Sequence, residues 1–280
     1  MKKLQQYLLV KSVGIYINFL SYVAPKKAAN LAYKLFSTPR LGRLSAGNLP
    51  QILQKANQET WTKNGHLFQT YLWKGNDTVI VLVHGWESNA SRWEKLLPYL
   101  LKSGNTIIAI DAPAHGLSSG KEFNVPLYAT FIDAVIQKHQ PKHIIGHSIG
   151  GLAATYYQHH YKHSLEKMIL LGAPSDFKIL LENYVKLLGL NSKIWNALLV
   201  YIKERLQINV DDFSGHLFLK NSNLQGIIAH DTTDTVVRFS EAEKLATSWE
   251  KAMFITTTGF GHSLHGDELY QKITSFLLEA

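Results

Sequence analysis

The amino-acid sequence predicts an α/β fold with a mostly parallel central sheet that is covered by helices on both faces. Two observations lead to this prediction. From residue 66 onward, short apolar runs rich in β-branched residues alternate with segments of helical periodicity. After Thr78, the run at 78–83 is continuously apolar rather than alternating, as is typical of strands that are buried on both sides.

The elements follow one another in a regular order. Each expected strand is a short β-branched or aromatic run, and each expected helix is a longer segment with apolar residues at helical spacing. The expected strands are 66–73, 78–83, 106–110, 143–145, 167–171, 225–229 and 252–256, and the expected helices are 92–101, 126–139, 152–160, 240–249 and 268–278.

One segment interrupts this alternation. Residues 175–223 separate two consecutive strands by about fifty positions, and their leucines and aromatic residues recur at helical spacing. We interpret the segment as a helical lid inserted into the domain. The alternative is an ordinary pair of connecting helices with one buried face.

The charge is concentrated at the amino-terminal end. Nine lysines and arginines precede the first acidic residue, Glu59, whereas the remainder holds 20 basic and 21 acidic residues, so the formal net charge of +8 lies within residues 1–58. We therefore predict a basic helical extension over 1–58 and an enzyme domain over 59–280. The turn-rich stretch 37–50 is predicted to be a linker or a docking loop.

The extension combines its basic residues with an apolar stripe. This pattern is typical of a helix that lies on an apolar partner and does not indicate nucleic-acid binding. The helix is predicted either to pack on the body or to contact an anionic membrane peripherally through residues 1–36. The stripe consists of Leu4, Leu8, Ile15, Phe19 and Tyr22.

A transmembrane span and a cleavable signal are both disfavoured. The longest uncharged run near this end, 12–24, has 13 residues, whereas a spanning helix needs roughly 20. Lys11 and Pro25 flank the run, which is unusual for a signal peptide. We expect a cytoplasmic protein that is free or peripheral to the membrane. The chain has no cysteine, which excludes disulfides and a cysteine nucleophile.

The motif Gly-His-Ser-Ile-Gly at 146–150 lies between an expected strand and an expected helix. This context exposes the serine at a tight turn, and glycines on either side keep the turn open. The following helix offers its amino-terminal N–H groups to a developing negative charge. Ser148 is therefore a candidate nucleophile.

A serine hydroxyl needs a base to accept its proton and a third group to orient that base. Two later strands end in suitable residues: His230, Asp231 and Asp234 follow one, and His262 and His265 follow the next. The order of serine, aspartate and histidine is the one described for hydrolases of the α/β class.

Five motifs in this order give the chain, over residues 66–280, a resemblance to the α/β-hydrolase superfamily. The motifs are Val-His-Gly-Trp at 83–86, Asp-Ala-Pro-Ala-His-Gly-Leu-Ser at 111–118, Gly-His-Ser-Ile-Gly-Gly at 146–151, His-Asp-Thr-Thr-Asp-Thr-Val-Val at 230–237 and Gly-Phe-Gly-His at 259–262. The resemblance implies the α/β-hydrolase fold.

The resemblance also implies roles for individual residues. Ser148 is implied as the nucleophile, His262 as the general base and then acid, and Asp234 as the group that orients His262. The backbone N–H groups of Trp86 and Ile149 are implied to form the oxyanion hole. Asp111 and Ser118 are expected to brace their loop, and His84 and His147 to be structural groups beside the serine.

Alternatives to two of these assignments remain open. His265 is a rival base, and Asp231 is a rival for Asp234, because the family usually has glycine where this chain has Asp231. A metal site built from these histidines and aspartates is disfavoured, since no ligand spacing typical of zinc is present. No metal and no cofactor is predicted.

The predicted function is that of a serine hydrolase that cleaves carboxylic esters with an apolar acyl group through an acyl-enzyme intermediate. The resemblance leaves open a thioesterase or acyltransferase, a carbon–carbon bond hydrolase, and a non-catalytic ligand-binding member of the fold. The expected partner is a small apolar ester, and the sequence does not indicate an oligomeric state.

Overall fold

The computed structural model describes residues 2–279, which divide into two compact units. The sheet unit comprises residues 39–175 and 215–279. The helical unit comprises residues 2–38 and 176–214, so it is assembled from the two segments that the sequence set apart as an extension and a lid.

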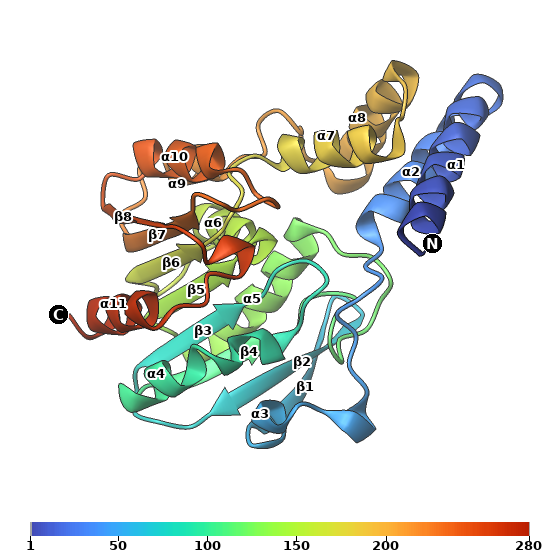
Figure 1. Ribbon diagram of the computed structural model, residues 1–280. Coiled ribbons are helices and arrows are strands. Elements are labelled where there is room, and N and C mark those ends of the chain that lie inside the picture. Colours follow the sequence, from blue (N-terminus) through green and yellow to red (C-terminus); the bar gives the residue numbers. More distant parts are fainter. Residues whose placement is uncertain (1, 280) are drawn as a thin grey trace. The chain divides into compact units, whose positions relative to one another are not determined.

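The sheet unit is built on an eight-stranded sheet with the order β1-β2-β4-β3-β5-β6-β7-β8 (Figure 1). Strands β1 and β2 pair with each other in antiparallel fashion, β2 pairs antiparallel with β4, and every other pairing is parallel. The strands are β1 (Asn57–Lys63), β2 (His66–Trp73), β3 (Val79–Val83), β4 (Thr106–Ile110), β5 (His143–His147), β6 (Lys167–Leu171), β7 (Gln225–Asp231) and β8 (Ala252–Thr257).

Helices cover both faces of this sheet. On one face, α4 (Leu97–Lys102) and α11 (Asp267–Leu278) pack in one apolar cluster with the strands (Figure 1). The helices α5 (Val125–His139) and α6 (Ile149–His160) pack against β3 and against each other. The remaining helices of this unit are η1 (Ala46–Asn48), α3 (Gln51–Gln54), η2 (Ala90–Glu94), α9 (Gly215–Leu219), α10 (Phe239–Ser248) and η3 (Gly261–Ser263).

The predicted fold class is confirmed, and two elements differ from the expectation. The helix expected at 92–101 is divided into η2 and α4, because Pro98 has no N–H to extend a helix that begins earlier. Strand β1 was not predicted. Its sequence is largely polar because it lies at the edge of the sheet, pairs only with β2 and is mostly exposed.

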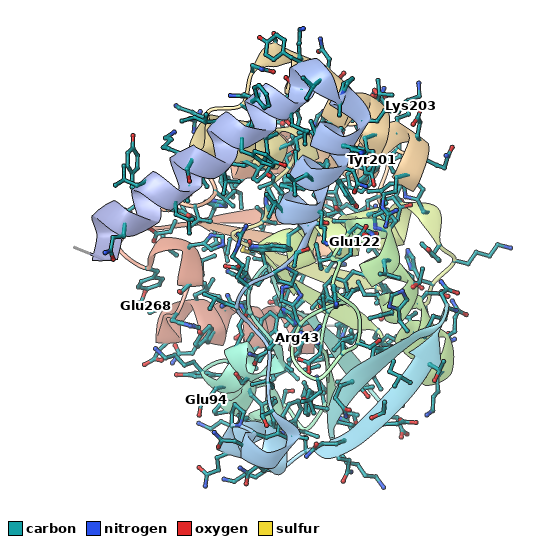
Figure 2. The ribbon with its side chains drawn as sticks, turned by 90° about the vertical axis from the view of Figure 1, so that its right-hand side faces the viewer. Arg43, Glu94, Glu122, Tyr201, Lys203 and Glu268 are labelled. Atoms are coloured by element: carbon teal, nitrogen blue, oxygen red, sulfur yellow. The ribbon has the colours of Figure 1, made fainter. Side chains whose placement is uncertain are left out.

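The stretch at 39–44 belongs to the sheet unit and docks on the loop after β4. Arg43, labelled in Figure 2, donates hydrogen bonds to the carbonyls of Ser118 and Gly120. Two backbone hydrogen bonds add to this contact. The Leu44 N–H donates to the Gly116 carbonyl at 3.1 Å, and the Gly116 N–H donates to the Gly42 carbonyl at 2.8 Å. This part of the basic extension is therefore fixed to the sheet unit.

The helical unit contains four helices from two distant parts of the chain: α1 (Lys2–Val23), α2 (Pro25–Ser37), α7 (Phe177–Leu188) and α8 (Ser192–Leu206). Helix α1 contacts the other three, and α2 contacts α8. Buried apolar residues come from all four helices, namely Ile17, Ala28, Ala29, Ala32, Tyr33, Leu181, Leu188, Ile194, Leu198 and Ile202.

Polar contacts fix α1 to the turn between α7 and α8. Asn18 donates to the Gly189 carbonyl at 2.8 Å and accepts from the Asn191 N–H at 2.9 Å. A Cβ on Gly14 would lie 1.8 Å from the Leu188 carbonyl oxygen, so only glycine permits this approach. Tyr201, labelled in Figure 2, donates to the Asn30 side chain of α2 at 3.3 Å.

The amino-terminal helices thus pack in a defined way with the inserted helices. Among residues 2–279, no helix is both long and apolar enough to cross a membrane. The predicted division at residue 58, the lid function and the cytoplasmic location stay predictions.

Candidate active site

Ser148 lies at the tight turn between β5 and α6. Its backbone has φ of 54° and ψ of −130°, a conformation that non-glycine residues rarely adopt. Neighbouring glycines make the turn possible, because a Cβ on Gly146 would lie 2.6 Å from the Gly151 Cα and one on Gly150 would lie 2.3 Å from the Val83 carbonyl oxygen. In this turn the Ser148 hydroxyl caps no backbone N–H of α6 and instead contacts His262.

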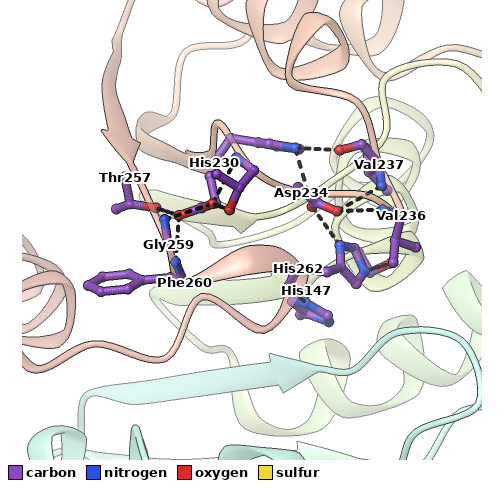
Figure 3. Close-up of polar contacts among 12 residues, drawn as sticks. His147, His230, Asp234, Val236, Val237, Thr257, Gly259, Phe260 and His262 are labelled. Atoms are coloured by element: carbon purple, nitrogen blue, oxygen red, sulfur yellow. Dashed lines mark hydrogen bonds and ion pairs between the residues drawn. The ribbon is translucent and has the colours of Figure 1, made fainter.

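The side chains of Ser148, His262 and Asp234 form a continuous hydrogen-bonded chain. His262 Nε2 lies 3.0 Å from Ser148 Oγ. On the other side of the ring, His262 Nδ1 lies 2.7 Å from Asp234 Oδ2 (Figure 3). Because a carboxylate only accepts, Nδ1 carries the proton and Nε2 is free to accept from the serine hydroxyl. This is the geometry of a nucleophile, a base and an orienting acid.

The Asp234 carboxylate is completely buried and well supplied with donors. Besides His262, the backbone N–H groups of Val236 and Val237 donate to Oδ1 at 2.8 and 3.0 Å (Figure 3). Burial raises the pKa of Asp234, but the hydrogen bonds from His262 and the two N–H groups outweigh it, and the net pKa lies below its usual value. Asp234 is therefore ionised near neutral pH.

Asp231, the rival carboxylate, faces the turn after β8 and not His262. Its oxygens accept from Thr233, from the Thr257 hydroxyl at 2.8 Å and from the Phe260 N–H at 2.9 Å (Figure 3). Burial raises its pKa, yet these donors together lower it below the ordinary value. Asp231 thus braces the 257–260 turn that leads to His262.

His265, the rival base, is engaged elsewhere. Its Nδ1 lies 2.5 Å from the Tyr270 hydroxyl of α11. The hydrogen bond to Ser148 Oγ is made by His262. Among the described residues, no group of three or more His, Asp or Glu side chains has the arrangement of a metal site.

Two side chains hold the backbone of the turn that carries His262. His147 Nε2 donates to the His262 carbonyl at 2.8 Å, and Arg92 Nη2 donates to the Ser263 carbonyl at 3.1 Å. Burial lowers the pKa of Arg92 to about 9. The sequence suggested a structural role for His147, whereas Arg92 carried no signal, because it lies outside the motifs and reaches the site only through folding.

The two N–H groups predicted for the oxyanion hole lie on segments that meet at Ser148. Ile149 is the first residue of α6, and Trp86 follows Gly85, where an added Cβ would lie 2.8 Å from Ser148 Cβ. Within the described part of the chain, neither N–H donates to a protein acceptor. Their role as an oxyanion hole stays a prediction.

Buried histidines support the 84–87 segment. His84 Nδ1 donates to the Gly85 carbonyl at 2.7 Å, and its Nε2 accepts from the Ala112 N–H at 2.9 Å. His115 Nε2 accepts from the Glu87 N–H at 3.0 Å. Burial lowers the pKa of His84 well below its usual value and that of His115 to about 4, so both rings are neutral and fixed in one tautomer.

Asp111 and Ser118 brace the loop after β4, as the sequence predicted. The Asp111 carboxylate accepts from the Ala90 and Leu117 N–H groups at 2.9 Å each and from the Tyr71 hydroxyl at 3.0 Å. Ser118 donates to the Asp111 carbonyl at 2.7 Å. Complete burial raises the pKa of Asp111 to about 6 in spite of these donors.

Comparison with known proteins agrees with this site. Residues 78–198 match the family model described as the alpha/beta hydrolase fold. A human serine hydrolase-like protein is 30% identical over 156 residues, which cover 52% of this chain and 70% of the relative. A zebrafish (Danio rerio) serine hydrolase-like protein is 33% identical over 125 residues, or 41% of this chain, and the match spans only 37% of that relative's length.

Two further proteins extend the comparison. The pimeloyl-[acyl-carrier protein] methyl ester esterase of Vibrio vulnificus is 25% identical over 145 residues, which cover 50% of this chain and 52% of the esterase. A meta-cleavage product hydrolase of Pseudomonas fluorescens superposes with a TM-score of 0.61 over 78% of this chain and 97% of its own, at 18% identity. At this level of identity, the similarity to the meta-cleavage product hydrolase shows a shared fold alone. Together, the family model and the serine hydrolase-like relatives support a hydrolase.

Proposed function

Because the chain belongs to the α/β-hydrolase family, we propose that it is a serine hydrolase that cleaves carboxylic esters with an apolar acyl group. The observation that carries this proposal is the continuous hydrogen-bonded chain from Ser148 through His262 to Asp234. An aspartate nucleophile would favour other chemistry, whereas serine favours transfer of an acyl group to water.

In the proposed reaction, His262 Nε2 takes the proton of Ser148 Oγ as that oxygen attacks the ester carbonyl carbon. The imidazolium that forms donates to Asp234, whose charge offsets it. When the tetrahedral intermediate collapses, the bond to the alcohol oxygen breaks and Nε2 returns the proton to that oxygen. Water then attacks the acyl-enzyme by the same route and releases the acid.

The carbonyl oxygen becomes negatively charged in the tetrahedral intermediate, and the N–H groups of Trp86 and Ile149 are proposed to stabilise it. Both donors are free of protein acceptors among the described residues, and both are backbone groups with fixed directions. Ile149 adds the positive end of α6. Loss of one such donor costs about 10²–10³ in rate in well-studied hydrolases.

The choice of an ester substrate is supported by the similarity to a methyl ester esterase. The preference for an apolar acyl group is inferred from the leucines and aromatic residues of the insertion, which we propose acts as a lid. Within the insertion, the residues that flank the helical segment 176–214 lie together in the sheet unit, where the Gly215 N–H donates to the Ser175 carbonyl at 2.7 Å. The first of these residues, Ser175, comes shortly after the carboxyl end of β6, which is paired with the serine strand β5.

Turnover of p-nitrophenyl esters of increasing acyl length tests the proposal. The wild-type chain should hydrolyse them, medium or long chains should be preferred over acetate, and Ser148→Ala should lose nearly all turnover. The matched control is Ser240→Ala, which changes an exposed serine of α10 and should leave turnover unaltered. Rates that survive in Ser148→Ala would rule out the assigned nucleophile.

A further inference from the structure

One face of α1 is apolar and exposed. At 3.6 residues per turn, the residues of this face fall within an arc of about 140° around the helix. After Gln5, one other residue of α1 falls within that arc, and it is the polar Ser12. The apolar side chains are between 56% and 70% exposed, and they are Leu8, Leu9, Ile15, Tyr16, Phe19, Tyr22 and Val23.

The opposite face of α1 is fixed in the helical unit. Ile17 and Ser21 are buried, and Gly14 touches the backbone at the end of α7. Asn18 and Lys11 donate to the carbonyls of Gly189 and Leu187 at 2.8 and 2.9 Å. Rotating α1 to bury its apolar face would break these contacts, so the face can be covered only from outside this unit.

Positive charge accompanies this face. The helical unit carries eleven lysines and arginines and five acidic residues, a formal net charge of +6, whereas the much larger sheet unit carries +2. Lys193 Nζ lies 4.0 Å from the centre of the Tyr22 ring, and Lys11 follows Tyr22 around the helix. Basic side chains therefore border the apolar face directly.

We propose that this face docks the helical unit on an anionic lipid surface, with α1 lying in the plane of the interface. Apolar side chains would enter the boundary of the acyl chains, and tyrosines are suited to the interface because one end of the ring is polar. Lys193 can extend to a lipid phosphate while its stem stays on the apolar surface.

Charge favours a lipid surface over a second copy of the chain. Two helical units that met through this face would bring together two bodies of net charge +6 with lysines at the contact, and like charges oppose such a contact. An anionic membrane attracts the same charges, by about 1 kcal/mol for each basic residue near the surface.

Sedimentation with vesicles tests the proposal on the full-length chain. Removing residues 2–36 is unsuitable, because α1 and α2 form much of the core of the helical unit. The first variant is Ile15→Gln with Phe19→Gln, which replaces exposed residues by a good helix former. The second is Lys193→Glu, which reverses the charge beside Tyr22 and places an acid in the first turn of α8, where it suits the helix dipole.

Wild-type protein should bind vesicles of phosphatidylcholine mixed with phosphatidylglycerol, less at high salt, and only weakly those of phosphatidylcholine alone. The apolar variant should lose on the order of tenfold or more in partitioning. The charge variant should lose roughly fivefold or more on anionic vesicles only. Met253→Gln, which changes an exposed apolar residue of β8, is the matched control and should bind as wild type.

Three results would overturn the proposal: wild type that binds neither kind of vesicle, an apolar variant that binds as wild type, or a wild-type dimer that the apolar variant abolishes. The last would identify the face as a self-association surface. Circular dichroism of each variant should match wild type, which separates loss of binding from loss of structure. The readout is sedimentation, so its failure would leave the hydrolase proposal standing.

Discussion

The sheet unit and the helical unit are organised in opposite ways. In the sheet unit, the residues of the site belong to short motifs at strand ends. The Asp234 carboxylate, for example, accepts hydrogen bonds from residues two, three and 28 positions later in the chain. In the helical unit, no motif is present, and contacts such as that of Asn18 with Gly189 join segments 171 positions apart. One unit presents a prearranged polar site, and the other presents an apolar surface.

The two proposals accordingly assign the chemistry to the sheet unit and the attachment to a lipid surface to the helical unit. The two units share three chain crossings, at 38–39, 175–176 and 214–215. If the units are independent, changes in one should alter catalysis without altering surface binding, and the reverse. The following predictions test that independence, beginning with the largest effect.

Asp234→Asn should cause the largest change. An amide can donate to Nδ1 and so favour the wrong tautomer of His262, and the loss in kcat is expected to be about 10⁴-fold, as for other enzymes with this arrangement. Steady-state ester hydrolysis measures it. The control, Asp231→Asn, should lower stability but keep much more of the kcat. Equal losses in kcat for the two variants would contradict the assignment of Asp234 as the residue that orients His262.

Gly14→Leu should disrupt the helical unit. Even its Cβ would lie 1.8 Å from the Leu188 carbonyl oxygen, so α1 must separate from α7, at a cost of several kcal/mol, roughly 3 or more. Hydrogen exchange should increase in 2–38 and 176–214 and stay unchanged in the sheet unit. Gly47→Ala, where an added Cβ meets no atom within 4 Å, is the control. Increased exchange throughout both units would contradict their independence.

Asp111 should give a pH-dependent contribution that is confined to the sheet unit. Burial raises the folded pKa of Asp111 to about 6, above its ordinary value of 3.8, so its contribution to stability is present below pH 4 and is lost as the pH rises through 6. The destabilisation caused by Asp111→Asn should therefore be greatest near pH 4 and shrink by about 3 kcal/mol by pH 7. Urea unfolding at several pH values measures this, and a constant difference would contradict the raised pKa.

Asp234 should show the opposite trend. Its folded pKa is below the usual value, so its contribution is present at neutral pH and is lost as the pH falls through the folded pKa. The destabilisation caused by Asp234→Asn should consequently decrease in acid. Unfolding curves of Asp111→Asn and Asp234→Asn, recorded side by side, should diverge in opposite directions with pH. Parallel behaviour would contradict the electrostatic difference between the two buried carboxylates.

His147→Phe should have the smallest effect of this series. The ring keeps its volume, but the donor to the His262 carbonyl is lost, and the expected loss in kcat is roughly tenfold with little change in KM. Measuring kcat and KM separately distinguishes a positioning role from substrate binding. A change in KM alone would point to contact with the substrate.

The sequence was sufficient to predict the fold class and to identify the candidate site residues that lie within local motifs. Ser148 and its glycines lie within five residues, and His262 could be favoured over His265 by the glycine before it. Arg92 could not be found, because its contact with Ser263 joins residues 171 positions apart and follows no spacing rule. Strand β1 was missed for the same reason, since its polar residues become a strand only by pairing with β2.

The pairing of α1 and α2 with α7 and α8 was beyond sequence reasoning as well. An apolar stripe indicates that a helix is covered but does not name what covers it. Gly14 and Asn18, which set the contact with the α7–α8 turn, resemble ordinary helix residues in the sequence. The two faces of α1 differ little in hydrophobicity, because apolar residues lie on both. One face packs within the helical unit, and the other is exposed.

The most direct test of the central claim is the intact mass of the protein after exposure to a fluorophosphonate, for wild type and Ser148→Ala in parallel. An activated serine attacks the phosphorus and displaces fluoride, which leaves a stable adduct. A single adduct on wild type that is absent from Ser148→Ala is predicted. A folded wild-type protein without an adduct, or an adduct retained by Ser148→Ala, would contradict the assignment of Ser148 as the nucleophile.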